Sequence, residues 1–292
     1  MTARFAWVLN LDAELELAQP NYTPRARVTQ QLELYGKDSR RLLGPDDVLL
    51  WPRAPDSAAF ERSAPRLGRS WCPTPRALAL FASFGIEPEP HPEAGVLRRV
   101  NHRRFAHELG GGLPGQRYLE DRDELDEALR NATAPLLLKR PLAFAGRGQQ
   151  RVYAYAKITD KERSWIAASL REDGLIVEPL VEPLLEVSVH GFIWRDGRHE
   201  LGFVCVQGVS ERGVFRQIRR AGPGELAASE RDALFERAEA TARALFEAGY
   251  FGPFGIDAYR HRGGFCAQSE INARYTMGFV TGFPRPPREL VL

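Results

Sequence analysis

Lysine is scarce in this chain of 292 residues. Of the 40 basic residues, 36 are arginine, and the four lysines are Lys37, Lys139, Lys157 and Lys161. Acidic residues number 38, so the formal net charge at pH 7 is only +2. The arginines are spread along the chain rather than gathered in a tail, which argues against a nucleic-acid partner. A lysine at a special position in the fold is therefore a candidate for a specific role.

Cysteine is also scarce, with Cys72, Cys205 and Cys266 far apart in the chain. Their spacing fits neither a metal-binding pattern nor an even set of disulfides, so we expect reduced, buried thiols. Long apolar runs are missing too, because the N-terminal run "FAWVLNLDAELELA" is interrupted by Asn10 and Asp12. The sequence therefore predicts a cytoplasmic protein without a membrane partner.

Proline-rich joints divide the chain. Residues 51–75 are predicted to form a long loop, and residues 85–95 form a second joint. Strands expected at 5–9 and 47–51, with a helix at 75–84, indicate a small α/β unit at the N-terminal end. Beyond the second joint, helix and strand patterns alternate regularly, which is typical of α/β or α+β architecture.

A glycine-bearing connector joins two expected strands at 135–139 and 151–156. Lys139 ends the first of these strands, which is otherwise apolar. A compact point charge beside a loop with free backbone N–H groups suits the binding of phosphate. The alternative is that the glycines of the connector only form an ordinary turn.

The last two expected strands form a hairpin that brings carboxylates together. If Gly263 and Gly264 make a two-residue turn, Asp257 lies directly opposite Glu270. Opposed side chains lie about 5 Å apart, which corresponds to a repulsion of about 3 kcal/mol at an effective dielectric constant near 20. Such a pair needs a cation, a shared proton or open solvent.

Two more polar side chains follow on the same face of the second strand. Side chains alternate between faces, so Glu270, Asn272 and Arg274 point the same way. A solvent-exposed hairpin would explain them as surface residues. A hard divalent cation such as Mg²⁺ explains the oxygen-bearing side chains of Asp257, Glu270 and Asn272 together, and Mg²⁺ usually shares its ligands with a substrate phosphate. This second interpretation implies a nucleotide.

The order of these features resembles the ATP-grasp superfamily. The resemblance covers residues 101–277 and depends on "LPGQRYLEDRDELDEAL", "LLLK" with "AGRG", "VEPLVEPLLEVSV", and "GIDA" followed by "EINAR". No Walker motif or protein-kinase signature competes with it. The resemblance implies an α/β (α+β) ATP-grasp fold. Its expected parts are an N-terminal pre-ATP-grasp α/β domain (1–98), a lid subdomain (99–183) and a metal-binding subdomain (184–292), the last two clamping ATP.

The resemblance also implies the residues that would bind ATP. Lys139 would contact the α and β phosphates. The residues expected to close over the triphosphate lie in a flap at 145–148, which contains Gly146, Arg147 and Gly148. Backbone groups of Glu178 and Val181 would bind adenine, and Glu186 would bind the ribose hydroxyls. The superfamily's first phosphate-binding lysine is replaced here by Arg103 and Arg104, with Arg103 as the candidate, and which of the two reaches the phosphates stays open.

The same resemblance makes Asp257, Glu270 and Asn272 the ligands of one or two Mg²⁺ ions, with Mn²⁺ as the alternative. Arg274 would act with Lys139 in catalysis by contacting the transferred phosphate. Three arginines, Arg216, Arg219 and Arg220, are candidates for binding a substrate carboxylate. The alternative is that they form a solvated basic turn. For His190 we expect a partly buried strand residue rather than a catalytic base.

Finally, the resemblance implies a ligase that joins a carboxylate to an amine through an acyl phosphate and releases ADP and phosphate. The partners would be small molecules, namely an amino acid, a peptide or a biosynthetic intermediate. A homodimer is compatible with the superfamily. Two alternatives share the nucleotide site: a small-molecule kinase, and a nucleotide-binding protein without turnover.

Overall fold

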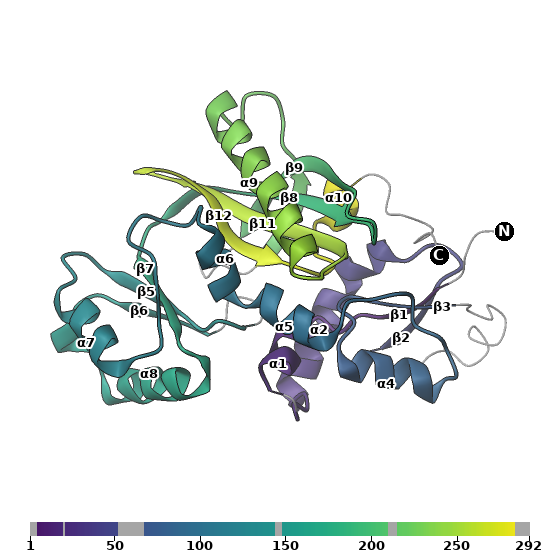
Figure 1. The fold of residues 1–292 in the computed structure, drawn as a ribbon, viewed down its shortest axis with the longest axis horizontal. Helices are drawn as coiled ribbons and strands as arrows, with labels where there is room; N and C mark the ends of the chain where they lie inside the picture. Colours follow the sequence, from purple (N-terminus) through teal and green to yellow (C-terminus); the bar gives the residue numbers. More distant parts are fainter. Residues whose placement is uncertain (1–4, 20, 52–66, 144–147, 210–214, 284–292) are drawn as a thin grey trace.

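The computed structural model describes residues 5–19, 21–51, 67–143, 148–209 and 215–283. Three sheets organise this part of the chain (Figure 1), and together with the helices they confirm the predicted mixed α/β class. Their strands follow one another in the sequence, within residues 5–70, 117–179 and 183–272. The domain boundaries after residues 98 and 183 stay predictions.

The first sheet is parallel, in the order β2 (Val48–Trp51), β1 (Phe5–Val8), β3 (Leu67–Ser70). The helical segments of this region are α1 (Ala13–Ala18), α2 (Ala26–Ser39), the 3₁₀ turn η1 (Arg40–Leu42) and α4 (Pro75–Ser83). A proline at the first position of α4 suits a helix start, because its backbone has no N–H to leave unpaired. Ala77 and Phe81 of α4 pack against Ala6, Val8 and Leu50.

Strand β3 corrects the predicted loop at 51–75. The loop prediction is wrong for residues 67–70, which pair in register with β1. Arg69 interrupts the apolar pattern there, yet it is buried because its guanidinium pairs with Glu89 at 2.8 Å and lies over the ring of Phe5. Residues 52–66 lie outside the described residues.

The second sheet is antiparallel, in the order β4 (Arg117–Leu119), β7 (Leu175–Pro179), β5 (Leu136–Lys139), β6 (Gln149–Val152). Helices α7 (Arg122–Arg130) and α8 (Asp160–Asp173) lie together along it in Figure 1 and share its apolar core. The strand expected at 151–156 begins earlier, because Gln149 already pairs with Lys139, and η2 (Tyr155–Lys157) is a 3₁₀ turn.

The third sheet is antiparallel, in the order β10 (Phe215–Arg220), β9 (His199–Val209), β8 (Pro183–Ile193), β11 (Gly252–His261), β12 (Gly264–Asn272). Alternation along these strands gives one apolar face, which includes Val187, Ile256 and Ile271 and packs against α9 (Ala228–Glu247). The intervening residues form the opposite face, which carries the polar side chains described below. Helices α5 (Ala94–Asn101) and α6 (Arg103–Leu109) lie beside β12, and α10 (Phe279–Gly282) contacts β8, β9 and β10.

The β11–β12 hairpin places Asp257 opposite Glu270, which confirms the predicted register at this point. The predicted turn is wrong, because His261 pairs with Gly264 and the turn lies one residue earlier. The register then shifts by two residues between Asp257 and Tyr259. In this stretch Gln268 leaves the ladder, its N–H donating to the carbonyl of Gly111 at 3.2 Å. An even shift returns every side chain to its original face, so the carboxylates still meet.

Two further expectations concern the whole described part of the chain. Within it, no helix has the length and apolar character needed to cross a membrane. Cys72, Cys205 and Cys266 are free and buried, as expected from their spacing.

Candidate functional site

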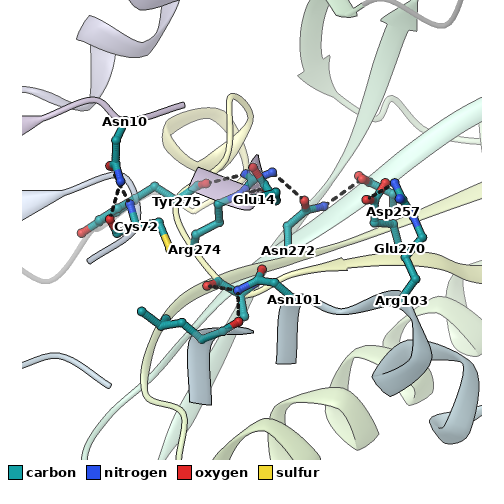
Figure 2. Close-up of polar contacts among 12 residues, drawn as sticks. Asn10, Glu14, Cys72, Asn101, Arg103, Asp257, Glu270, Asn272, Arg274 and Tyr275 are labelled. Atoms are coloured by element: carbon teal, nitrogen blue, oxygen red, sulfur yellow. Dashed lines mark hydrogen bonds and ion pairs between the residues drawn. The ribbon is translucent and has the colours of Figure 1, made fainter. Parts of the chain in front are cut away.

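The polar face of the third sheet brings the three predicted metal ligands together (Figure 2). Asp257 and Glu270 are directly opposite each other, and Asn272 donates from Nδ2 to Asp257 Oδ2 at 3.0 Å. Gln207 from β9 donates from Nε2 to Asp257 Oδ1 at 2.6 Å. The sequence analysis missed Gln207, because nothing within its own strand points to a partner on β11.

The environment of Asp257 is unfavourable to its negative charge. Burial raises the pKa of its carboxyl to about 7, and the charge of Glu270 adds to the rise, whereas hydrogen bonds from Gln207 and Asn272 and the charge of Arg274 oppose it. A buried carboxylate beside a second one is stabilised either by a proton or by a cation. The pair therefore offers oxygen ligands that a divalent cation could bind in place of the proton.

Of the two arginines at the start of α6, Arg103 reaches this site. Its Nη2 lies 2.7 Å from Glu270 Oε1, and its Nη1 donates to the carbonyl of Arg140 at 2.5 Å. Arg104 instead pairs with Glu108 along the exposed side of the same helix, at 2.7 Å. The geometry favours Arg103 for the role that the sequence left open between them.

Arg274 lies between helix α1 and the metal-ligand candidates (Figure 2). Its Nε donates to Glu14 of α1, and its Nη2 donates to Asn272 Oδ1 at 2.9 Å. Burial alone would lower the pKa of Arg274, but the carboxylate of Glu14 raises the pKa above its usual value. Arg274 is therefore held as a cation by Glu14, a residue that the sequence analysis did not single out.

Asn101 fixes the backbone at the end of β12 (Figure 2). Its Oδ1 accepts from the N–H of Ala273 at 2.8 Å, and its Nδ2 donates to the carbonyls of Ala273 at 3.3 Å and Leu97 at 2.9 Å. Ala273 stands between Asn272 and Arg274, so Asn101 holds the segment that carries both side chains. No local signal could identify this contact, because the partners are 172 residues apart.

Lys139 is buried, at 9% exposure, whereas Lys157 and Lys161 are exposed. Its Nζ lies 2.5 Å from Oε1 of Glu178 on the neighbouring strand β7. The other carboxylate oxygen of Glu178 accepts from Gln116 Nε2 at 2.6 Å. One of the few lysines in the chain thus lies in a cluster of polar side chains that contact one another.

A small pocket connects this lysine with the third sheet. Lys139 and Glu178 line it together with Arg103 and with Ser269 of β12. Because Arg103 also contacts Glu270, the pocket lies beside the carboxylates. Its volume of about 10 Å³ is close to what one water needs.

The flap falls largely outside the described residues. Gly146 and Arg147 are not among them, whereas Gly148 is described and has a φ of 69°. Its carbonyl accepts from the N–H of Arg140 at 2.8 Å, which anchors the end of the flap next to Lys139.

The residues expected to bind the base and the ribose lie in the β7–β8 connection and in the two strands that it joins. Val181 packs with Leu113, Tyr259 and Cys266 in a small apolar cluster. Glu186 is half-buried on β8, and burial raises the pKa of its carboxyl. An apolar cluster next to a half-buried carboxyl is a suitable setting for a planar base and a sugar.

Two of the three candidate substrate-binding arginines, Arg219 and Arg220, lie on opposite faces of β10. Arg219 lies on the α9 side of β10, where its Nη2 is 2.5 Å from Glu225 Oε1, so the structure does not support a role for it at the site. Arg220 lies on the other face, over the ring of Phe203 at 4.0 Å. The side chain of Arg216 lies outside the described part of the structure.

His190 is a buried residue of β8, which confirms the strand interpretation. Ser188 Oγ lies 3.0 Å from its Nε2, and Thr276 Oγ1 lies 2.9 Å from its Nδ1. Burial lowers the pKa of His190 to about 4, so the imidazole is neutral at pH 7.

The donor set suits a cation that takes only part of its ligands from the protein. Among the described residues, no three or more His, Cys, Asp or Glu side chains are grouped to hold a metal ion. Mg²⁺ is usually bound by one or two carboxylates, with waters and phosphates completing its coordination. The oxygen of Asn272 faces Arg274, so its amide must rotate before this oxygen can bind a cation.

Comparisons with known proteins identify the fold. No protein-family model matches the sequence, and no curated protein matches it. Biotin carboxylase from Campylobacter jejuni is similar in structure, with a TM-score of 0.62 and 13% identity over 94% of this chain and 66% of that one. D-alanyl-alanine synthetase A from Vibrio cholerae has a TM-score of 0.59 and 14% identity, over 98% of this chain and 93% of that one.

A third structure, N5-carboxyaminoimidazole synthetase from Staphylococcus aureus, has a TM-score of 0.54 and 10% identity over 94% of this chain and 71% of that one. All three neighbours have the same architecture. The chain has the ATP-grasp fold. The ATP-grasp resemblance expected from the motifs is thus confirmed for the fold, and the activity is argued below from the site.

Proposed function

We propose that this protein is an ATP-dependent ligase that joins a carboxylate to an amine through an acyl phosphate. The observation that carries the proposal is the facing pair Asp257 and Glu270, with Asn272, in an ATP-grasp fold and beside the pocket of Lys139. Among proteins of this fold, the Staphylococcus aureus synthetase was solved with ADP, and a carboxyaminoimidazole ribonucleotide synthase from Aspergillus clavatus was solved with ATP.

In this proposal, ATP lies between the second and third sheets. The charges of Lys139 and Arg103 would neutralise its phosphates, since both line the pocket there. Backbone groups of Glu178 and Val181 would bind adenine, and Glu186 would bind the ribose. The flap at 145–148, anchored at Gly148, would close over the phosphates.

The residues at the carboxylate pair fit Mg²⁺, with Mn²⁺ as the alternative. Asp257 and Glu270 supply hard oxygen donors whose repulsion a cation would relieve, and Asn272 supplies a third after its amide rotates. When bound, the ion would neutralise phosphate charge and polarise the reacting phosphoryl group. Arg103 would then be released from Glu270 and free to contact the nucleotide.

The reaction requires no protein nucleophile. A carboxylate oxygen of the substrate bonds to the γ-phosphorus while the bond to the bridging oxygen breaks and ADP leaves. The amine then bonds to the acyl carbon, phosphate leaves, and the nitrogen loses a proton. Lys139, Arg103 and Arg274 would stabilise the charge that develops, and closure of the flap would keep water from the acyl phosphate.

Product analysis tests the proposal. The purified protein is incubated with ATP and Mg²⁺ against pools of amino acids and carboxylic acids, and ADP, phosphate and product masses are followed. Free phosphate with a condensed product is expected. ADP with a stable phosphorylated product would support the kinase instead. Nucleotide binding without any turnover across the pools would support the third alternative, a binding protein.

A further inference from the structure

Glu178 presents its side chain, and not only its backbone, to the nucleotide pocket. Its Oε1 lies 2.5 Å from Lys139 Nζ, and the two side chains are 4% and 11% exposed. On the β5–β7 ladder, Leu137 pairs with Glu178 and Lys139 pairs with Ile176. Lys139 and Glu178 are thus diagonal neighbours on one face, within reach of each other. The buried ammonium group of Lys139 is therefore paired with the carboxylate of Glu178.

A second set of contacts fixes this anion independently of Lys139. Gln116 donates from Nε2 to Glu178 Oε2 at 2.6 Å, and the Oε1 of the same amide lies 3.2 Å from His107 Nδ1. Both carboxylate oxygens of Glu178 are therefore engaged, and the carboxylate cannot follow a departing lysine without breaking the contact with Gln116. Glu178 has the geometry of a fixed charge rather than of a mobile surface partner.

Such a pair has a direct consequence for a phosphate. A buried ion pair is costly to separate, because each charge loses its partner in a medium of low dielectric constant. A phosphate oxygen that approaches Lys139 must take the place of Glu178 Oε1 or share the ammonium with it, while the carboxylate repels the incoming negative charge. An uncharged nucleoside meets neither effect.

We propose that Glu178 is an internal counter-anion of Lys139 and a specificity-determining residue, which weakens binding in proportion to the phosphate charge that reaches the lysine. This inference rests on the proposed nucleotide site and adds a role to one of its residues. In this role the carboxylate favours release of ADP after turnover and keeps Lys139 paired between turnovers.

Calorimetric binding of adenosine, ADP and ATP to the full chain tests the inference, using wild type and Glu178→Gln. Glutamine keeps the shape and removes the charge, and its single carbonyl oxygen can accept from Gln116 or from Lys139 but not from both. We expect ADP and ATP to bind Glu178→Gln at least about tenfold more tightly, which is about 1.4 kcal/mol, with adenosine changed by less than about threefold. Glu124→Gln, which removes an exposed charge from α7 of the same region, is the matched control and should change none of the three affinities.

Equal changes for adenosine and ADP, or weaker ADP binding by Glu178→Gln, would overturn the counter-anion role. If wild type binds neither ADP nor ATP, the proposed function fails as well, so the two failures are distinguishable. If Glu178→Gln does not fold, Glu178→Asp replaces it, because the shorter side chain moves the charge away from Lys139. This variant should bind ADP more tightly relative to adenosine than wild type does, by a smaller factor than expected for Glu178→Gln. Unchanged or weaker relative ADP affinity in that variant would overturn the role equally.

Discussion

At the scale of single residues, the site contains charged side chains whose burial would be unfavourable for each one alone and is offset by neighbouring charges. Asp257 is half-buried opposite Glu270, Arg103 compensates Glu270, and Arg274 is compensated by Glu14. Removing one member leaves another buried charge without its partner, which is more costly than removing an exposed pair. Substitutions that keep shape but change charge are therefore the most informative at this site.

Glu270→Gln is the first such substitution. It keeps a hydrogen-bond acceptor for Arg103 but removes one of two carboxylates from the proposed cation site. We expect ATP turnover to fall by at least about 100-fold, in the range seen when one electrostatic contributor to a transition state is lost. The melting temperature should change little.

Steady-state ADP release, with circular dichroism as the check on folding, measures the effect of Glu270→Gln. Glu225→Gln is the control, because Glu225 pairs with Arg219 on the opposite face of the same sheet. Normal turnover by Glu270→Gln at saturating Mg²⁺ would show that Glu270 is not a metal ligand.

Asp257 predicts a pH dependence of stability. Its folded pKa, about 7, lies above that of an ordinary aspartate, so the folded state binds the proton more tightly than the unfolded state. Its contribution to stability is therefore present at low pH and lost as pH rises toward and through 7. Relative to Asp257→Asn, wild type should lose up to about 1.4 kcal/mol per pH unit over the steepest part of this range.

Urea unfolding of wild type and Asp257→Asn between pH 5 and 8, with a chelator present, measures this difference. The comparison with the variant is needed because His190, whose folded pKa is lowered to about 4, acts in the opposite direction below its unfolded pKa. Parallel pH profiles for the two proteins would contradict a raised pKa at Asp257.

At the scale of elements, the site depends on how β12 is held by three helices, of which α5 and α6 precede it by more than a hundred residues. Gln268 leaves the ladder and contacts Thr241 of α9 and the carbonyls of Ala106 and Gly110 at the end of α6. Asn101 holds Ala273 at the other end of the strand. The strand that carries Glu270 is thus fixed on both sides of that residue.

Asn101→Ala should loosen the end of β12. It leaves the buried N–H of Ala273 without an acceptor, which costs about 1 to 3 kcal/mol in the free energy of unfolding. Urea unfolding measures the loss of stability, and faster hydrogen exchange at the N–H of Ala273 would locate this loss at the end of β12. Asn131→Ala, at an exposed residue that follows α7, is the control. Protection at Ala273 equal to that of wild type would show that Asn101 does not hold the strand.

At the scale of the whole molecule, an ion pair joins the N-terminal region to the segment that follows β12. Glu14 belongs to α1, and Arg274 follows β12, 260 residues later. The same chain of contacts runs through Asn272 to Asp257 (Figure 2). From Asp257 it reaches Gln207 on β9. A change in the N-terminal region can therefore alter the geometry of the proposed metal ligands.

Glu14→Gln tests this connection. It leaves the buried guanidinium of Arg274 without its anion, so we expect a loss of about 3 to 5 kcal/mol in the free energy of unfolding. Arg219→Gln breaks the exposed pair with Glu225 and should cost far less, because water screens exposed charges. Chemical denaturation of both variants makes the comparison. Similar losses for the two would mean that the Glu14–Arg274 pair contributes no more than a surface pair.

The elements themselves were largely predictable from the sequence. Apolar periodicity and capping residues are local, so the helices at α4, α7 and α8 and most strands of the third sheet appear where the pattern indicates. β3 was missed because Arg69 looks like a surface residue until Glu89 pairs with it. α1 and α2 were not predicted, although Val28 and Leu32 of α2 are both buried and have the spacing of one helix face.

For the site, the sequence by itself determined which side chains share a face, because alternation along a strand is a local property. It placed Asp257 with Glu270 and Asn272, and it singled out Lys139 as a rare lysine at the end of an apolar strand. Only the tertiary structure decided their partners: Arg103 rather than Arg104 at Glu270, Glu14 at Arg274, Gln207 at Asp257 and Glu178 at Lys139. The physical reason is that burial and charge pairing depend on residues distant in the sequence. The pattern of a strand fixes the face to which a side chain points, whereas packing fixes the environment that makes a carboxylate or an ammonium reactive.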